Sequence, residues 1–448
     1  MSAYQAKRTP RFNSPAAWRD ILNPPAPSEP LAGDHTADFV VIGGGFAGLS
    51  AARRLRQLQP SSTIFVLDAL AIAEGSAGRN SGFMIDLPHD LASEDYAGQG
   101  AAADQVLTGL NRHAIRFAQD AVAEFDINPA FADPVGKVNG AASEAGHAHN
   151  ESYAAHLASL GEVFEKLDAK DMQAMTGSDY YTSGLYTPGT LMLQPAGYVL
   201  GVAAGLRAQG VQIWENSAIV GFQKQGQSWC VQTAHGRVST PQIILANNGH
   251  LESFGVARGH LMQLFLYASM TPELSADDLK SLGGQPRWGI TPSDPMGTTM
   301  RRIDTAQGGN RIVTRTCATV RRTMEVSASD VRRAARVQRR KFDARFPKLA
   351  GVQMQYEWAG HLCLSLNGVS VTGVIEDGVI SACVQNGLGT ARGTLTGIAA
   401  AELACGQNSD ITRYFTEEDK PKKLPPQPFA QFGANAYLRW KEHQARAE

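Results

Sequence analysis

The sequence reads DFVVIGGGFAGLSAARRL over residues 38–55, IFVLD over 64–68 and AEGSAGRNSG over 73–82. A short apolar run leads into three spaced glycines and a helix-like segment, and a second apolar run then ends on an acidic residue. This order of strand, glycine turn, helix and acid-ending strand is typical of a βαβ unit that binds a dinucleotide.

Each residue of this motif has a physical task. Gly43 allows the tight turn, Gly45 lets the backbone approach a pyrophosphate, and Gly48 lets the helix pack closely on the strand. The helix N-terminus stabilises the phosphate charge. Asp68 is expected to accept hydrogen bonds from a ribose, and its charge disfavours a cofactor with a 2′-phosphate.

The composition fits a soluble globular enzyme of two or three domain equivalents. The chain has 448 residues, of which 43% are hydrophobic and 19% are charged, and its formal net charge is −1. A balanced charge gives no global attraction to nucleic acid or to an anionic membrane. No apolar run approaches the roughly 20 residues of a membrane span, and no signal-peptide core is recognisable at the N-terminus.

The five cysteines are scattered and odd in number, and no C-x-x-C pair occurs. The sequence therefore predicts neither a disulfide framework nor a metal site. We expect a reduced, cytoplasmic protein.

A second glycine turn, NGLGTARG at 386–393, follows another apolar run near the other end of the chain. Its glycines are spaced too widely for a second dinucleotide fingerprint, and no acid-ending strand follows it. We therefore expect the helices after both turns to address one large cofactor, with the second stabilising negative charge on a reduced flavin ring. Small residues at 74–82 would let backbone pass close to that ring, and Arg79 and Asn80 offer donors for phosphate or ring atoms.

These motifs resemble the flavin-binding start of the D-amino-acid oxidase-like superfamily of FAD-dependent oxidoreductases, in particular its glycine/sarcosine oxidase and gamma-glutamylputrescine oxidase branch. The segment GRNSG at 78–82 resembles the second flavin motif of that branch, and NSAIVGF at 216–222, WAG at 358–360 and the turn at Gly387 follow in its order. The resemblance implies FAD and a fold of mixed α/β and α+β type. It predicts a Rossmann-like FAD-binding domain built from discontinuous segments, and a substrate domain whose antiparallel sheet roofs the flavin.

The expected division of the chain follows from this resemblance and from the proline-rich ends. The N-terminal arm either wraps the body through Trp18 and Ile21 or is loose. The predicted parts are an arm at 1–36, an FAD-binding domain at 37–130, 186–255 and 356–407, a substrate domain at 131–185 and 256–355, and a C-terminal tail at 408–448.

The predicted cofactor-binding residues come from the two glycine turns, the acid-ending strand and the loops that would face the flavin. They are Gly43, Gly45, Phe46, Ala47, Gly48, Asp68, Ala69, Gly78, Arg79, Asn80, Ser81, Ile219, Asn247, Gly249, Gly387, Leu388, Gly389 and Thr390.

Three residues are candidates for contact with the substrate. Tyr267 lies on a predicted roof strand, where it either offers its hydroxyl or is a core aromatic. His361 either hydrogen-bonds substrate or ring, or is a structural histidine. His89 either approaches the pocket or is an ordinary loop residue.

Members of the family that oxidise small amino acids usually place an arginine near 361–365, where this chain reads HLCLS. A simple amino-acid substrate is therefore less well supported than an amine. Four arginines on predicted roof strands remain as candidates for an acidic group, and alternation alone does not choose between them. They are Arg301, Arg302, Arg315 and Arg321.

The resemblance implies oxidation of a C–N bond in a small-molecule amine or amino acid, with O2 or another electron acceptor. Two alternatives remain open: a flavin-dependent oxidase of the tRNA-modification type, and a non-catalytic flavoprotein. The tRNA alternative draws on an arginine-rich helix expected at 330–346 and capped by Ser329. The neutral net charge favours a solvated helix face and no nucleic-acid partner.

Overall fold

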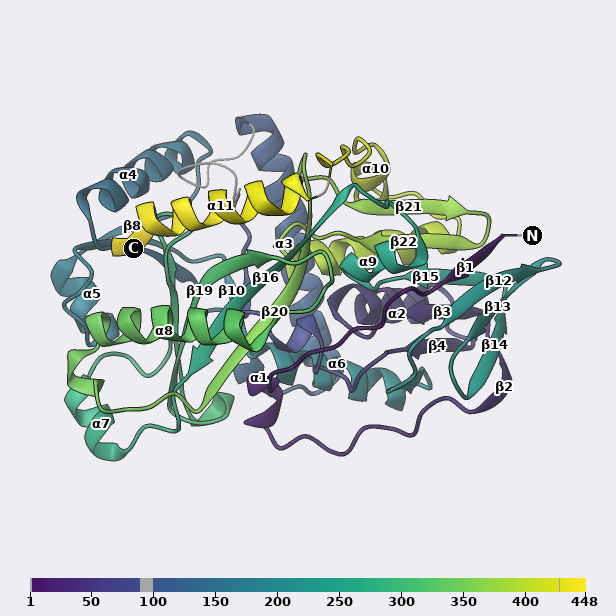
Figure 1. Cartoon of the computed structure of the whole chain (residues 1–448), viewed down its shortest axis with the longest axis horizontal. Coiled ribbons are helices and arrows are strands. Elements are labelled where there is room, and N and C mark those ends of the chain that lie inside the picture. Colours follow the sequence, from purple (N-terminus) through teal and green to yellow (C-terminus); the bar gives the residue numbers. More distant parts are fainter. Residues whose placement is uncertain (1, 89–99, 427) are drawn as a thin grey trace.

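The protein is described here by a computed structural model that covers residues 2–88, 100–426 and 428–448. Two large sheets organise it, one six-stranded and largely parallel, the other eight-stranded and largely antiparallel. Figure 1 shows the six-stranded sheet on the right and the eight-stranded sheet on the left. The predicted combination of a Rossmann-like unit with an antiparallel sheet is confirmed.

The six-stranded sheet joins strands that are far apart in the sequence, in the order β11-β4-β3-β15-β22-β21. All neighbours are parallel except β21 and β22, which are antiparallel. The strands are β3 (Phe39–Ile42), β4 (Ile64–Leu67), β11 (Gln212–Trp214), β15 (Gln242–Leu245), β21 (Val371–Glu376) and β22 (Val379–Cys383).

Both faces of the four inner strands β4, β3, β15 and β22 are buried, which is why these strands are rich in apolar residues. Val41 and Val66 face a layer of helices, whereas Val40 and Phe65 face a second, five-stranded sheet. The helices are α2 (Phe46–Leu58), α3 (Ala101–Glu124), α6 (Pro195–Ala208) and α9 (Ala391–Ala404). The five-stranded sheet contains β1 (Ala3–Gln5), β2 (Gly33–Thr36), β12 (Gly221–Gln225), β13 (Ser228–Gln232) and β14 (Gly236–Thr240).

Helices α2 and α9 pack backbone against backbone. A Cβ atom on Gly397 would lie 2.1 Å from the carbonyl oxygen of Ala47, and one on Gly393 would lie 3.3 Å from Cβ of Phe46. Helix α9 starts at Ala391, inside the glycine-rich segment 386–393. The absence of side chains at Gly393 and Gly397 allows this close packing.

The eight-stranded sheet follows the order β20-β16-β19-β18-β17-β7-β9-β8, and only its β17–β7 pair is parallel. Its strands are β7 (Lys137–Ala141), β8 (Glu165–Asp168), β9 (Ser183–Thr187), β16 (Leu261–Met270), β17 (Trp288–Pro292), β18 (Thr299–Ile303), β19 (Arg311–Val320) and β20 (Tyr356–Ser365). A small fourth sheet contains β5 (Phe83–Met84), β6 (Ala132–Asp133) and β10 (Leu191–Leu193).

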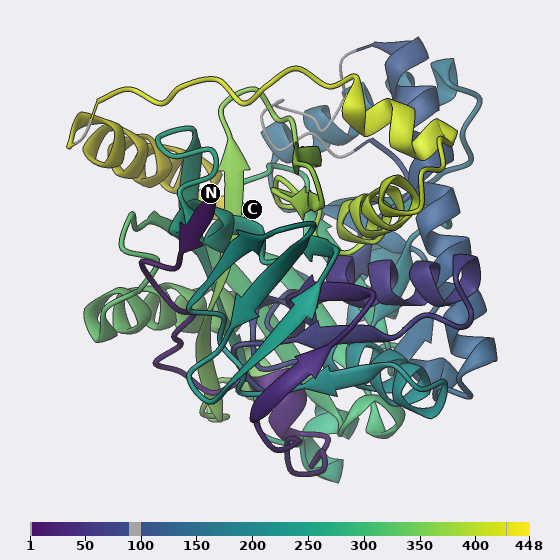
Figure 2. The same cartoon turned by 90° about the vertical axis from the view of Figure 1, so that its right-hand side faces the viewer.

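The remaining α-helices lie around these sheets (Figures 1 and 2). They are α1 (Ala17–Asp20), α4 (Glu144–Ser159), α5 (Ala169–Thr176), α7 (Ala276–Leu282), α8 (Ala328–Arg345), α10 (Asp410–Thr416) and α11 (Phe429–Gln444). The N-cap of α8 is Ser327, whose Oγ accepts a hydrogen bond from the backbone N–H of Asp330, so the cap expected at Ser329 is wrong. None of the described helices combines the length and apolar character of a membrane span.

Both ends of the chain are more ordered than their proline content suggests. The N-terminal arm wraps the body, because β1 pairs with β12 and Trp18 is fully buried. The expected C-terminal tail contains α10 and α11, and the side chain of Glu448 accepts hydrogen bonds from Ser143 and Ser293. The domain boundaries given above remain a prediction.

Candidate cofactor and active site

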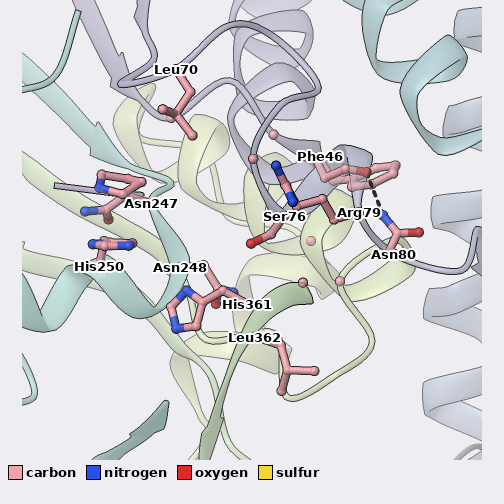
Figure 3. A pocket seen from close by; sticks show the side chains of 18 of the residues that line it. Phe46, Leu70, Ser76, Arg79, Asn80, Asn247, Asn248, His250, His361 and Leu362 are labelled. Atoms are coloured by element: carbon pink, nitrogen blue, oxygen red, sulfur yellow. Dashed lines mark hydrogen bonds between the residues drawn. The ribbon is translucent and has the colours of Figure 1, made fainter. Parts of the chain in front are cut away.

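A cavity of about 300 Å³ lies where the two large sheets meet. This volume is at the lower end of the roughly 300–1,000 Å³ typical of small-molecule sites. Figure 3 shows side chains from both parts of the fold around it. The predicted cofactor residues that line it are Gly43, Gly45, Phe46, Ala47, Asp68, Ala69, Arg79, Asn80, Ser81, Ile219, Asn247, Gly387, Gly389 and Thr390.

The first glycine turn has the geometry that its sequence predicts. Gly43 has φ +112°, a value that favours glycine, and a Cβ there would lie 2.6 Å from the carbonyl oxygen of Ala246. A Cβ on Gly48 would lie 1.7 Å from the carbonyl oxygen of Gly43. Gly45 differs, because a Cβ there would meet only the Cβ of Ala77, at 3.5 Å. The space beside Gly45 is thus open to a ligand.

The Asp68 carboxylate supports this turn from inside. Its Oδ2 accepts a hydrogen bond from the backbone N–H of Gly44 at 2.6 Å, and its Oδ1 accepts one from Leu70 at 2.8 Å. Burial raises the pKa of Asp68 to about 6, against the opposing effect of these two hydrogen bonds. Asp68 lines the cavity, and its contact with a ribose remains a prediction.

The second turn and the 74–82 loop close the other end of the cavity. Thr390 precedes α9, and its hydroxyl donates to the carbonyl oxygen of Phe83 at 2.8 Å. The Arg79 guanidinium donates to the carbonyl oxygens of Glu74, Ser14 and Pro15. Its side chain therefore anchors the N-terminal arm, so any donor to the cofactor from this residue would be its backbone.

Four predicted cofactor residues do not line this cavity. Gly48 and Gly78 are pressed against the carbonyl oxygens of Gly43 and Ala73. Gly249 packs against Gln263 and His361, and Leu388 lines a smaller adjoining cavity. His89 lies outside the described residues.

Tyr267 reaches the cavity from β16 through a break in strand register between Leu266 and Tyr267. Bulges of this kind re-aim side chains beside active sites. The hydroxyl is buried and has no hydrogen bond of good geometry with a described residue, although nearby Thr319 lowers its pKa. Burial dominates and raises the pKa of Tyr267 to about 12, so the phenol stays protonated.

His361 lines the cavity from β20 and is held in place by its neighbours. Its Nε2 lies 2.9 Å from Oε1 of Gln263, and its ring stacks on Phe265 with 5.0 Å between centroids. The ring of His250, a cavity residue that sequence reasoning missed, lies edge-on to it at 5.5 Å. His250 directly follows the predicted Gly249, and its position in the turn was the available signal.

Because both histidines are buried, we expect the free energy of unfolding to decrease on acidification. Burial lowers the pKa of His361 to about 3, and burial followed by the charge of Arg8 lowers that of His250 to about 4. Unfolded chains bind these protons from about pH 6.5 downward, so the folded state loses stability as the pH falls from there toward 4. In this pH window, a plot of melting temperature against pH should have a smaller slope for His361→Gln than for the wild-type protein. Exposed His235→Gln should keep the wild-type slope, and an equal slope in all three proteins would contradict the account.

Only one of the four candidate arginines lines the cavity. Arg301 donates to the carbonyl oxygen of Ser81, Arg302 to that of Gly283, and Arg321 to the carboxylate of Asp330. Arg315 on β19 lines both the large cavity and an adjoining one of about 70 Å³. The arm residues Arg8, Thr9, Pro10 and Phe12 also line the large cavity, which the sequence did not indicate.

Comparison with known proteins identifies the family. The model of the FAD-dependent oxidoreductase family matches residues 38–403, so the chain belongs to that family. The chain is 25% identical to gamma-glutamylputrescine oxidoreductase of Escherichia coli over 90% of each chain, and 22% identical to a probable oxidoreductase of Rhizobium meliloti over 88% of this chain and 89% of the relative.

Solved structures share the fold. Glycine oxidase from Geobacillus kaustophilus has a TM-score of 0.69 at 14% identity, covering 86% of this chain and 100% of its own. An L-amino acid deaminase from Proteus vulgaris has a TM-score of 0.67 at 14% identity, and the match covers 88% of this chain and 97% of the deaminase chain. Fold and family agree that the protein is an FAD-dependent oxidoreductase.

The residues present fit FAD. Neither Gly45 at the start of α2 nor Thr390 at the start of α9 caps its helix with a side chain. Backbone N–H groups at both helix starts are therefore available to ligand oxygens, except that of Arg392, which donates to the carbonyl oxygen of Leu388 at 3.0 Å. Both ends line one cavity, and the backbone beside Gly45 is open. These are the features that a diphosphate and a flavin ring require.

Proposed function

We propose that the protein oxidises a C–N bond of a small amine or amino acid that carries an acidic group. The observation that carries this proposal is the position of Arg315, a cation on β19 of the eight-stranded sheet, which lines both cavities. An arginine fork matches a carboxylate in shape and charge. Relatives named for the oxidation of gamma-glutamylputrescine and glycine support the reaction class.

We infer the cofactor contacts from the geometry. The N-terminus of α2 would bind the diphosphate, Asp68 the ribose, and the backbone of Asn80 and Ser81 with the N-terminus of α9 the flavin ring. Bound FAD supplies an acceptor for hydride from the substrate carbon that bears nitrogen. The C–H bond breaks, a C=N bond forms as nitrogen loses its proton, and water hydrolyses the imine to a carbonyl compound and an amine.

The chain's own residues bind and orient the substrate. Tyr267 stays protonated, and burial lowers the pKa of His361 to about 3, which makes it too weak a base near pH 7 to accept a proton from a substrate ammonium. The substrate must therefore react as its neutral amine. Tyr267 would donate a hydrogen bond to it, and Arg315 would hold its acidic group.

The electrons removed from the substrate pass on to O2 or to another acceptor. The five cysteines are all free, which supports a reducing compartment and hence a cytoplasmic enzyme.

Anaerobic mixing with pairs of amines tests this function. Each pair consists of an acid-bearing amine and the same amine without its acid, drawn from N-methyl amino acids, amino acids and gamma-glutamyl amines. We expect acid-bearing members to reduce the flavin about 100-fold faster and to give a carbonyl product, because a buried charged hydrogen bond contributes roughly 3 kcal/mol. Equal rates within each pair would reject the acidic group, and no reduction by any amine would reject C–N oxidation.

A further inference from the structure

Helix α11 exposes a row of aromatic side chains. The exposed fractions are 75% for Phe429, 73% for Phe432, 55% for Tyr437 and 52% for Trp440. Every large aromatic side chain that is exposed among the described residues lies on this helix. The spacing puts all four on one helix face. Large exposed apolar groups that cluster in this way usually mark an interaction site.

The opposite face of α11 fixes the helix to the body. Asn435 accepts a hydrogen bond from the backbone N–H of Val320 at 2.9 Å, and Glu442 accepts one from Ala318 at 2.9 Å. These bonds satisfy backbone N–H groups of β19 beyond Arg315, where the pairing of β19 with β18 ends. These specific contacts fix the orientation of α11, so its aromatic row points away from the protein body.

Helix α8 lies beside α11 and exposes a row of arginines. Arg333 of α8 pairs with Glu442 of α11 at 3.0 Å, and Figures 1 and 2 show both helices on the same side of the molecule. Arg332, Arg336 and Arg340 are exposed, spaced four residues apart, and none forms an ion pair with a described residue. We call the outward sides of α8 and α11 the α8/α11 face.

The acidic residues of α8 and α11 do not neutralise the positive charge of this arginine row, because each is already paired with another arginine of the protein. Asp330 pairs with Arg321, Asp343 with Arg339, and Glu442 with Arg333. The face is therefore apolar and aromatic on α11 and positive on α8, although the whole chain has a formal charge of −1. Helix α11 also lies beyond residues 38–403, the part that matches the family.

We propose that the α8/α11 face docks on the surface of an anionic lipid bilayer. Tyrosine and tryptophan favour the headgroup region, because their rings are apolar and their polar atoms stay hydrated there, and phenylalanine buries its apolar ring at the same interface. Arginines attract anionic headgroups. A second copy of the chain fits less well, since a two-fold contact would place two arginine rows in one interface with no unpaired acid from either helix to meet them. The attachment is peripheral, since no described helix can span the bilayer.

Co-sedimentation of the FAD-loaded protein with vesicles tests the proposal. Vesicles of equal parts phosphatidylglycerol and phosphatidylcholine should bind it at least 10-fold more tightly than phosphatidylcholine alone. The triple variant Arg332→Gln, Arg336→Gln, Arg340→Gln should bind about 100-fold more weakly, at roughly 1 kcal/mol per arginine. The double variant Phe432→Ser, Trp440→Ser should weaken binding to both kinds of vesicle.

Two exposed residues elsewhere provide matched controls: Arg116→Gln on α3 and Val163→Ser should bind vesicles like wild type. An unchanged visible flavin spectrum shows that each variant is folded. Wild-type protein that stays in the supernatant with anionic vesicles would overturn the proposal. So would a dimer in lipid-free solution that Phe432→Ser, Trp440→Ser dissociates, since that result assigns the face to a second copy of this chain.

Discussion

Gly45→Ala should give a folded protein that has lost most of its FAD. The new methyl group meets only the Cβ of Ala77, at 3.5 Å, so the polypeptide accommodates it. The space that it fills belongs to the cavity, where the cofactor's diphosphate must approach the backbone. Forcing a methyl group into an occupied contact costs about 1–3 kcal/mol. We therefore expect FAD binding up to about 100-fold weaker, measured by titrating FAD into the stripped protein.

Gly48→Ala is the matched comparison, because the same methyl group there would lie 1.7 Å from the carbonyl oxygen of Gly43. That clash is with backbone, so Gly48→Ala should lower the melting temperature of the stripped protein, whereas Gly45→Ala should not. Gly45→Ala that binds FAD like wild type would contradict the assigned position of the diphosphate.

Arg315→Met should lower kcat/KM for an acid-bearing amine by about 100-fold. Methionine keeps much of the length and apolar contact of the side chain but removes its charge. Loss of one partner from a buried charged hydrogen bond costs roughly 2–5 kcal/mol, and about 3 kcal/mol corresponds to this factor. Steady-state rates with the acid-bearing member of a matched amine pair measure the effect, and the member without the acid should lose much less.

Arg311→Met is the control on the same strand. Arg311 donates to the carbonyl oxygen of Thr271 at 2.9 Å and lines neither cavity, so its loss should leave kcat/KM close to wild type. Arg315→Lys should recover part of the activity, because it restores charge without the bidentate fork. If Arg315→Met and Arg311→Met behave alike, the acidic group binds elsewhere.

The glycine turns that line the cavity could be predicted because their constraints are local. Gly43 and Gly48 owe their identity to close backbone contacts, and Gly45 leaves space for a ligand; one stretch of sequence contains all three. Asp68 could also be predicted from local sequence, because it directly follows the next strand along the chain. The turn at Gly387 could be matched to the first because it too follows an apolar strand and opens a helix.

The parts that were missed depend on tertiary contacts. Arg79 reads as a phosphate donor in sequence, but the folded arm supplies carbonyl oxygens that take its guanidinium. Choosing Arg315 among four arginines required their folded positions, because it is the one of the four that lines the cavity. The prolines before α11 suggested a tail, since nothing local shows that Asn435 and Glu442 satisfy the open edge of β19.

The central claim is that two helix N-termini, drawn from opposite ends of the chain, hold one FAD. A crystal structure of the FAD-loaded protein tests it most directly. We expect the diphosphate at the start of α2 and the flavin ring between residues 79–81 and the start of α9. An FAD bound outside this cavity, or a ring placed away from Thr390, would contradict the claim.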